Sequence, residues 1–305
     1  MNEIKGNLAV EAKTFYERTL VQRLLPELLF LKYGQKKSYA KNKGKTISFR
    51  KFESLPVQKD ENGNVKALAE GVTPDGQDLT VTEITATVKQ YGDYIPLTDE
   101  VDMVAIDPVL TESSELCGEQ AGLTLDTVAR DIICAGTNVQ YAGGVVSANE
   151  VVGKLTFEEV KKAVRTLKKA NAKKLAGNCF IGIVDPETSY DLQNDPAFID
   201  ISKYNGGEKL EDGEIGKLGG VRFIETTNTY VDSHNNHYVK IIGKDAYGVV
   251  DINGKSKPEI IVKPLGSSGT EDPLNQRGTV GWKANMTAVR LNELAMLSLI
   301  VKVSE

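Results

Sequence analysis

One segment between two strand-like runs constrains the fold more than any other feature. Residues 46–49 and 79–88 alternate apolar and polar side chains as strands do, and 24 mostly polar residues at 55–78 separate them. Unstructured connections longer than ~12–15 residues are uncommon inside compact domains and usually serve a function. Asn62-Gly63 is a turn signal, and a phase slip at Glu83 predicts a β-bulge. The sequence therefore predicts a hairpin that projects from the body.

Composition sets the broad class. The chain has 305 residues, of which 40% are hydrophobic and 26% charged, as in an ordinary globular protein large enough for two lobes. We find no run near the ~20 apolar residues that span a bilayer, and no apolar signal-peptide core near Met1, so no membrane partner is expected. The three cysteines, Cys117, Cys134 and Cys179, are odd in number and widely spaced, which favours reduced thiols.

Charge is divided unevenly along the chain. Residues 1–51 hold 12 Lys/Arg and 4 Glu, whereas the rest holds 25 Lys/Arg and 38 Asp/Glu, although the net charge is only −5. Opposite charges favour pairing of the two regions, within a subunit or between subunits. The alternative is a DNA-facing surface, which we favour less because aromatic side chains do not alternate with the basic ones. The basic segment contains Lys36, Lys37, Lys41, Lys43 and Lys45.

A long amphipathic helix is predicted from Asp107, an N-cap followed by Pro108, to a stop at Gly136. It spans about 28 residues, hence ~42 Å. Gly118 and Gly122 lie four residues apart on one face, and two interpretations fit equally: close approach of another backbone, or tolerated weak spots. The apolar stripe consists of Leu110, Cys117, Ala121, Leu125, Val128, Ala129, Ile132 and Ile133. The acidic residues, Asp107, Glu112, Glu115, Glu119, Asp126 and Asp131, make this helix a candidate partner for the basic segment.

The remaining pattern mixes helices and strands without strict alternation, which predicts an α+β fold. A helix is expected over 12–25, a second after the capping box at Thr156, and a short one after Asp185-Pro186. Strands are expected at 179–184, 221–225, 238–242, 259–263, 280–291 and 294–303. Loops are expected at 33–45 and 213–220.

Motifs of catalysis are absent from the sequence. It has no phosphate-binding glycine loop and no nucleophile elbow, so no catalytic residue and no cofactor are expected. His234 and His237 lie in an expected hairpin turn, where only Asp232 accompanies them, so no metal site is expected either. A carboxylate-dependent hydrolase would have to use Asp99, Glu100 and Asp102, which a polar surface explains more simply.

The segment after the hairpin is predicted to act as a hinge. Gly92 permits a sharp backbone bend, and Pro96 limits strand pairing. With Tyr91 and Tyr94, these residues are expected to orient the hairpin against a neighbouring subunit. The alternative is an ordinary hydrophobic junction within one subunit.

Four stretches carry a resemblance to a known family. They are residues 90–99 (QYGDYIPLTD), 135–144 (AGTNVQYAGG), 70–76 (EGVTPDG) and 118–122 (GEQAG). The chain resembles the major capsid proteins of tailed phages, in the coliphage N-four-type family with the Hong Kong 97-type fold. The resemblance runs from about residue 20 to 141, and more loosely to the end.

This resemblance implies a structural protein that assembles itself into hexamers and pentamers of an icosahedral shell around double-stranded DNA. It implies an N-terminal arm (1–44), an extended hairpin loop (45–98), a peripheral domain with a spine helix (99–150), an axial domain (151–275) and a return to the peripheral domain (276–305). The implied hairpin positions include Asn62, Gly63, Gly71, Pro74 and Gly76. A scaffolding protein and a portal are implied partners, and assembly in the host cytoplasm is implied. An encapsulin-like compartment shell is the alternative that shares this fold.

Overall fold

The structure is a computed structural model of the chain. It describes residues 20, 23–24, 28–38, 44–53, 55–60, 62–68, 70–71, 73, 76–100, 109–175, 178–198, 214–251, 258–267 and 272–304. Most of the predicted helix at 12–25 therefore lies outside the described residues, as do Lys41, Lys43, Pro74, Asp102, Asp107 and Pro108. No helix among the described residues is long and apolar enough to cross a membrane.

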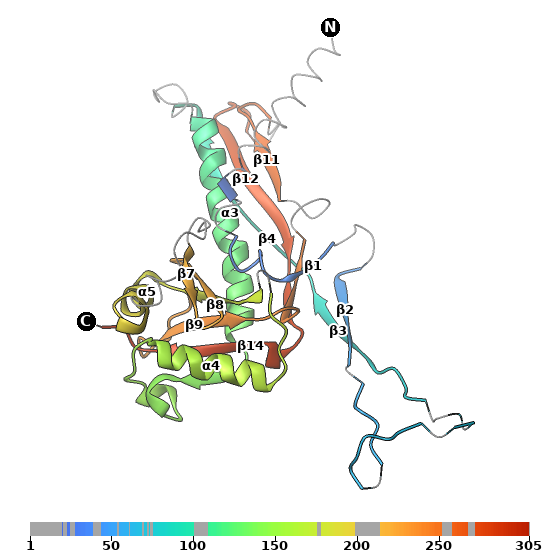
Figure 1. Ribbon diagram of the computed structural model, residues 1–305. Coiled ribbons are helices and arrows are strands. Elements are labelled where there is room, and N and C mark those ends of the chain that lie inside the picture. Colours follow the sequence, from blue (N-terminus) through green and yellow to red (C-terminus); the bar gives the residue numbers. More distant parts are fainter. Residues whose placement is uncertain are drawn as a thin grey trace.

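A long helix packed on a three-stranded sheet forms the upper part of the molecule (Figure 1). The helix is α3 (Val109–Cys134), and the sheet has the order β11 (Glu259–Lys263), β12 (Arg277–Met286), β4 (Lys89–Thr98). The 26 residues of α3 correspond to a helix length of ~39 Å. Gln120 of α3 accepts from the indole of Trp282 on β12 at 3.0 Å and donates to Asp93 of β4 at 2.7 Å. These side-chain hydrogen bonds fix the helix to both strands.

The helix α3 confirms the predicted stripe in part. Cys117, Ala121, Leu125, Ala129 and Ile133 are buried, whereas Leu110, Val128 and Ile132 are only half-buried. At Gly118 the structure favours the close approach of another backbone over a tolerated weak spot, because a Cβ there would lie 2.5 Å from the carbonyl oxygen of Leu20. The helix ends at Cys134, two residues before the stop expected at Gly136.

A six-stranded mixed sheet forms the lower part of the molecule (Figure 1). Its order is β5 (Val139–Tyr141), β14 (Met296–Val301), β9 (His237–Ile242), β6 (Phe180–Val184), β8 (Val221–Glu225), β7 (Glu214–Leu218). The flanking helices are α4 (Phe157–Lys169) and α5 (Pro186–Gln193). Thr156 and Asp185 are their N-caps, as the sequence predicts. Inward-facing Val160, Val164 and Leu167 of α4 pack into a core separate from the one under α3.

Two smaller sheets complete the fold. One has the order β1 (Gln35–Lys37), β10 (Tyr247–Val250), β13 (Ala288–Arg290), and the other pairs β2 (Thr46–Phe52) with β3 (Val81–Thr87). Strands β8 and β11 begin and end where predicted, and the run at 280–291 divides into β12 and β13 at Thr287. Residues 35–37 and 214–218 are strands where loops were expected. The first segment pairs with β10, which is distant in sequence, and the second pairs with β8 across a glycine turn.

The β-bulge predicted near Glu83 is wrong. Strand β3 pairs with β2 residue by residue from Thr46↔Thr87 to Phe52↔Val81, with Glu83 opposite Arg50. The phase slip has another origin, since Val81, Thr82 and Glu83 are all exposed. At this distance from the body both faces of the two-stranded ribbon meet solvent, so the alternation has no buried side to follow.

Candidate functional site

The predicted projecting hairpin is present in the structure. Strands β2 and β3 leave the body side by side, and the chain between them extends as an open arm (Figure 1). Asp60 shapes the expected turn at Asn62-Gly63, accepting from the backbone N–H groups of Asn62 at 3.0 Å and Asn64 at 2.8 Å. Gly63 and Gly71 have φ values of +83° and +76°, which glycine adopts without strain. We name residues 52–81 the hairpin arm.

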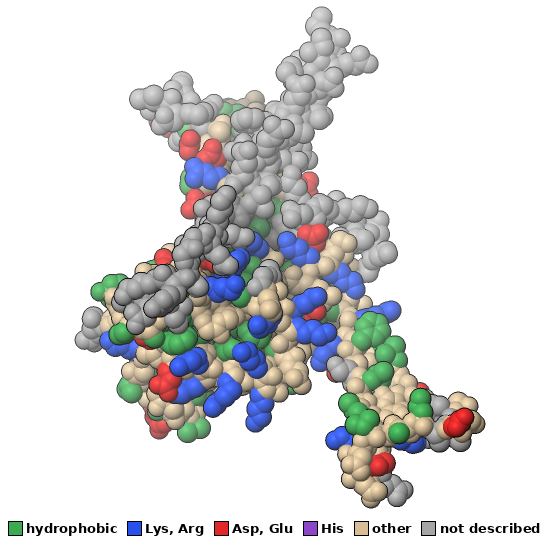
Figure 2. All heavy atoms as spheres, in the orientation of Figure 1, with side chains coloured by type: hydrophobic (Ala, Val, Ile, Leu, Met, Phe, Trp, Pro, Cys, Tyr) green, Lys and Arg blue, Asp and Glu red, His purple; other side chains and the backbone are tan. Residues whose placement is uncertain are grey.

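The hairpin arm exposes more apolar side chains than the polar reading of its sequence suggests. They are Phe52, Leu55, Val57, Val65, Leu68, Leu79 and Val81, between 44% and 77% exposed. Figure 2 shows hydrophobic side chains along this projection, away from the body. Monomeric proteins rarely expose apolar side chains in such a group, and large exposed patches mark interaction surfaces. The hairpin arm therefore has the character of a surface that binds another molecule.

At the root of the hairpin, the structure contradicts the predicted bend at Gly92, whereas the orientation of the hairpin against a neighbouring subunit stays a prediction. Gly92 makes no bend: β4 runs unbroken opposite β12, with Gly92 paired to Lys283 and Pro96 to Thr279. A Cβ at residue 92 would lie 2.5 Å from the carbonyl oxygen of Trp282, so close approach of two strands explains this glycine. Pro96 is tolerated in the ladder because β4 is an edge strand.

A shallow groove lies over this sheet beside the root. Its volume is about 440 Å³, and Tyr91, Gly92 and Tyr94 line it together with residues of β11 and β12. Tyr94 is 65% exposed, whereas Tyr91 is half-buried against the core. The structure thus places three of the four predicted hinge residues along this groove, without the bend.

The basic segment pairs within the chain where it is described. Arg23 donates two hydrogen bonds to Glu115 of α3, at 2.6 and 2.8 Å, and this contact raises the pKa of the arginine. Lys37 donates to the carbonyl oxygen of Ser48, and its ammonium lies 5.6 Å from the ring of Phe49. Lys36 and Lys45 are exposed. The expected pairing of the basic segment with the acidic helix thus holds for Arg23 and Glu115.

Asp126 departs from the acidic face on which the sequence places it. It is fully buried and accepts from the backbone N–H groups of Phe30 at 2.7 Å and Leu31 at 3.3 Å. Its second oxygen accepts from the amide of Asn228 at 3.1 Å. Burial raises the pKa of this carboxyl to about 6, against the lowering effect of these hydrogen bonds. Asp126 therefore fixes the chain at residues 30–31 to α3.

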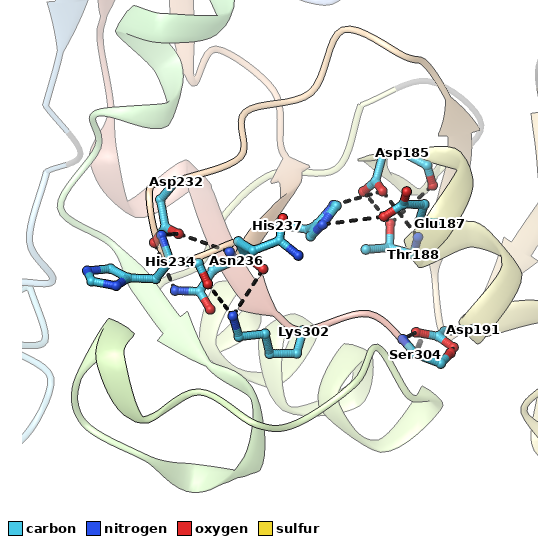
Figure 3. A network of polar contacts seen from close by, with 11 residues as sticks. Asp185, Glu187, Thr188, Asp191, Asp232, His234, Asn236, His237, Lys302 and Ser304 are labelled. Atoms are coloured by element: carbon cyan, nitrogen blue, oxygen red, sulfur yellow. Dashed lines mark hydrogen bonds and ion pairs between the residues drawn. The ribbon is translucent and has the colours of Figure 1, made fainter.

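The two histidines lie on opposite sides of their turn (Figure 3). His234 is exposed and points away, whereas His237 is buried and points toward α5. Its Nδ1 lies 2.9 Å from Asp185, and its Nε2 lies 3.5 Å from Glu187. The two histidines therefore do not share a site. Sequence spacing gave no sign of the contact with Asp185, which is 52 residues away.

Asp185, Glu187 and His237 bring ligand atoms within 4.8 Å of one another, a group that sequence reasoning missed. Both oxygens of Asp185 are engaged, one with the hydroxyl of Thr188 at 2.7 Å and the other with Thr188 N–H and the His237 ring. These contacts cap α5 and orient His237. Their arrangement explains the group as a structural connection between α5 and β9.

We expect Asp185→Ala to lower the free energy of unfolding by about 2–4 kcal/mol, since it removes a helix cap and leaves the buried Thr188 and His237 without their acceptor. Chemical denaturation of the subunit measures the loss. Glu187→Ala is the matched control, because Glu187 is 67% exposed and its contact with His237 is long. Equal effects from the two variants would contradict this account.

The remaining groups that suggest chemistry are interior ones. Cys117, Cys134 and Cys179 are buried free thiols, as expected, and burial raises the pKa of Cys117 and Cys134 to about 11. Lys240 is buried in β9, donates to Ser298 at 2.6 Å, and has a pKa lowered to about 8 by burial. All of these side chains are buried in the core, where they contribute to packing.

Comparison with solved structures identifies the architecture. The chain is similar to the capsid of Ralstonia phage GP4 (TM-score 0.64, 10% identity, covering 89% of this chain and 87% of that one). It is also similar to the capsid of Cyanophage P-SCSP1u (0.63, 14%, 89% and 86%) and to the Cyanophage Pam1 capsid (0.62, 14%, 92% and 92%). The mixed α+β fold is that of the Hong Kong 97-type phage capsid proteins. No curated protein sequence matches the chain.

The sequence profile of the phage capsid protein family matches residues 81–298, which is more than half of the chain. The chain belongs to this family. It is a major capsid protein, a structural and non-enzymatic component that forms the shell of the virion.

Proposed function

We propose that the hairpin arm is the part of each subunit that lies on a neighbour and holds the shell together. Its seven exposed apolar side chains carry the proposal, because they stand away from the subunit's own core. Burial of apolar surface stabilises an interface by ~25 cal/mol per Å², and obligate interfaces commonly exceed ~2,000 Å². An extended arm reaches such an area without enlarging the body.

The proposal also includes a division of the chain into domains. Residues 1–44 serve as an N-terminal arm and residues 45–98 as the extended hairpin loop. Residues 99–150, with α3 as spine helix, and 276–305 form the peripheral domain, and residues 151–275 form the axial domain. The separate cores under α3 and around α4 support this division, although β14 of the last segment pairs with β9 of the axial one.

The partners are also proposals. The subunits form hexamers and pentamers of an icosahedral shell around double-stranded DNA, in a tailed phage with a capsid of the coliphage N-four type. Assembly takes place in the host cytoplasm with a scaffolding protein and a portal. Membership of the phage capsid family supports this set of partners over an encapsulated enzyme cargo.

Replacing three apolar residues of the hairpin arm tests the proposal. We expect Leu55→Asp/Leu68→Asp/Leu79→Asp to abolish shells while the thermal unfolding of the subunit stays unchanged, since all three are more than half exposed. Light-scattering-coupled size exclusion and negative-stain imaging measure assembly, with candidate scaffolding protein present and absent. Val146→Asp/Val152→Asp is the control, because both residues are at least 80% exposed on the body. Normal shells from the triple variant would refute the role of the hairpin arm.

A further inference from the structure

The outer face of α4 carries a concentration of positive charge that the sequence analysis did not single out. Between residues 154 and 174 the chain has eight Lys/Arg and two Glu, a net charge of +6. We name Lys161, Arg165, Lys168, Lys169 and Lys173 the α4 basic face. All five are exposed, and Figure 2 shows Lys and Arg side chains gathered on this side of the body.

Pairing within the subunit leaves this charge largely uncompensated. Both glutamates lie in the first turn of α4, and both contact Lys162, at 3.4 and 2.8 Å. Lys161 lies over the ring of Phe157 at 4.6 Å. Among the described residues, Arg165, Lys168, Lys169 and Lys173 have no ion-pair partner. The backbone N–H of Lys244 donates to the carbonyl oxygen of Lys173. The residue that follows Lys244 in sequence, Asp245, is acidic.

Helix stability explains only part of the pattern. Lys168 and Lys169 are in the last turn, where a cation interacts favourably with the helix dipole by about 0.3–1 kcal/mol. Lys161, in the second turn, and Lys173, beyond the helix end, gain nothing from that effect. The spacing of residues 161, 165, 168 and 169 places them together on the solvent side, opposite Val160, Val164 and Leu167.

The composition of the face distinguishes two kinds of partner. Protein interfaces have an apolar, often aromatic centre from which charged residues are depleted. No large exposed apolar residue is found between residues 153 and 175. A surface of four lysines and one arginine with no apolar centre instead suits the phosphate backbone of nucleic acid, which is bound through charge and counterion release without base readout.

We propose that the α4 basic face binds the phosphate backbone of double-stranded DNA without sequence preference. The inference rests on the proposed function, because it requires DNA to be what the shell encloses. It assigns the DNA-contacting surface to α4 and not to residues 32–51 of the basic segment, where Lys37 donates to Ser48 and Lys51 pairs with Glu53. Four or five phosphate contacts from these lysines and Arg165 would give a slope of log K against log salt of about −4.

Titration of the unassembled full-length chain with a fluorescent 20-base-pair duplex tests the proposal without any need for shells. Anisotropy at several salt concentrations gives affinity and slope for two unrelated duplex sequences. The test variant is Lys168→Glu/Lys169→Glu/Lys173→Glu. Lys89→Glu/Lys263→Glu/Arg277→Glu is the control, with the same change in net charge at exposed residues outside the α4 basic face and the hairpin arm. Circular dichroism confirms that both variants are folded.

We expect the test variant to bind at least about tenfold more weakly near 0.1 M salt and to lower the slope by about 3, whereas the control keeps the wild-type slope. Equal losses from both variants would overturn the proposal, since net charge alone would then explain binding. Failure of the wild-type chain to bind either duplex at low salt would also overturn it. If the test variant keeps DNA binding but loses association between copies, the face binds a second subunit instead. Failure of the hairpin-arm test would leave this titration unaffected.

Discussion

Asp126→Ala is expected to release residues 28–31 from α3 and to lower the free energy of unfolding by about 2–4 kcal/mol. The substitution leaves the N–H groups of Phe30 and Leu31 and the amide of Asn228 without their acceptor. Each unsatisfied buried polar group costs about 1–3 kcal/mol, and the loss of the buried charge offsets part of that cost. Denaturant titration measures the stability, and hydrogen exchange at Phe30 reports the release.

The same carboxylate makes stability depend on pH. Because the folded-state pKa is about 6 and the unfolded value is near 3.8, the folded state binds the proton more tightly. The contribution of this group to stability is therefore largest below pH ~4 and is lost as pH rises through ~6, with a total change of about 3 kcal/mol. Asp126→Asn is expected to remove this slope, because it cannot ionise. An unchanged slope between pH 4 and 6 in that variant would show that another group causes it.

The burial of Asp126 and its contacts with residues 30–31 could not be predicted from the sequence. Helical periodicity predicted α3 and its buried stripe, because spacing along one helix is a local property. The same reading placed Asp126 among exposed acids, since composition cannot show that residues 30–31, almost a hundred positions away, bring two backbone N–H groups to it. The contact of His237 with Asp185 was missed for the same reason.

Strand prediction succeeded where side-chain alternation met a buried core. Strands β8 and β11 were placed to the residue, whereas β1 and β10 were missed because they are short and pair with each other in parallel across 213 positions. In the hairpin arm, the sequence correctly predicted the projection and the turn at Asn62-Gly63. It did not predict the exposed apolar side chains on which the proposed function rests, since an isolated Leu or Val in a polar stretch is typical of a loop.

Glycine was the residue most easily misread. A glycine in sequence permits either an unusual backbone angle or a close neighbour, and only the partner strand distinguishes the two. Gly63 belongs to the first kind, with φ of +83°, and Gly92 to the second. The difference changes what a substitution at residue 92 should do.

Gly92→Val is expected to destabilise the subunit itself by about 3 kcal/mol or more. The new Cβ would lie 2.5 Å from the Trp282 carbonyl oxygen, a backbone atom within the β4–β12 ladder that cannot rotate away. Although Gly92 is exposed, the partner backbone leaves no room for a Cβ, and forcing extra atoms into a packed site costs about 1–3 kcal/mol, and more where the backbone must move. The neighbouring Asp93 is tied to α3 through Gln120, so a shift of β4 would also disturb that contact.

Thermal unfolding of the unassembled chain, measured beside shell formation, separates this account from a hinge. A hinge predicts a stable subunit that fails to assemble, whereas close packing predicts that loss of shells accompanies a lower melting temperature. Gly76→Val is the matched control for the melting temperature, because a Cβ there meets nothing within 4 Å and its φ is not positive. If Gly92→Val leaves the melting temperature unchanged while shells are lost, residue 92 acts between subunits. If both decline together, assembly depends on Gly92 through the fold of the sheet at the root of the hairpin arm.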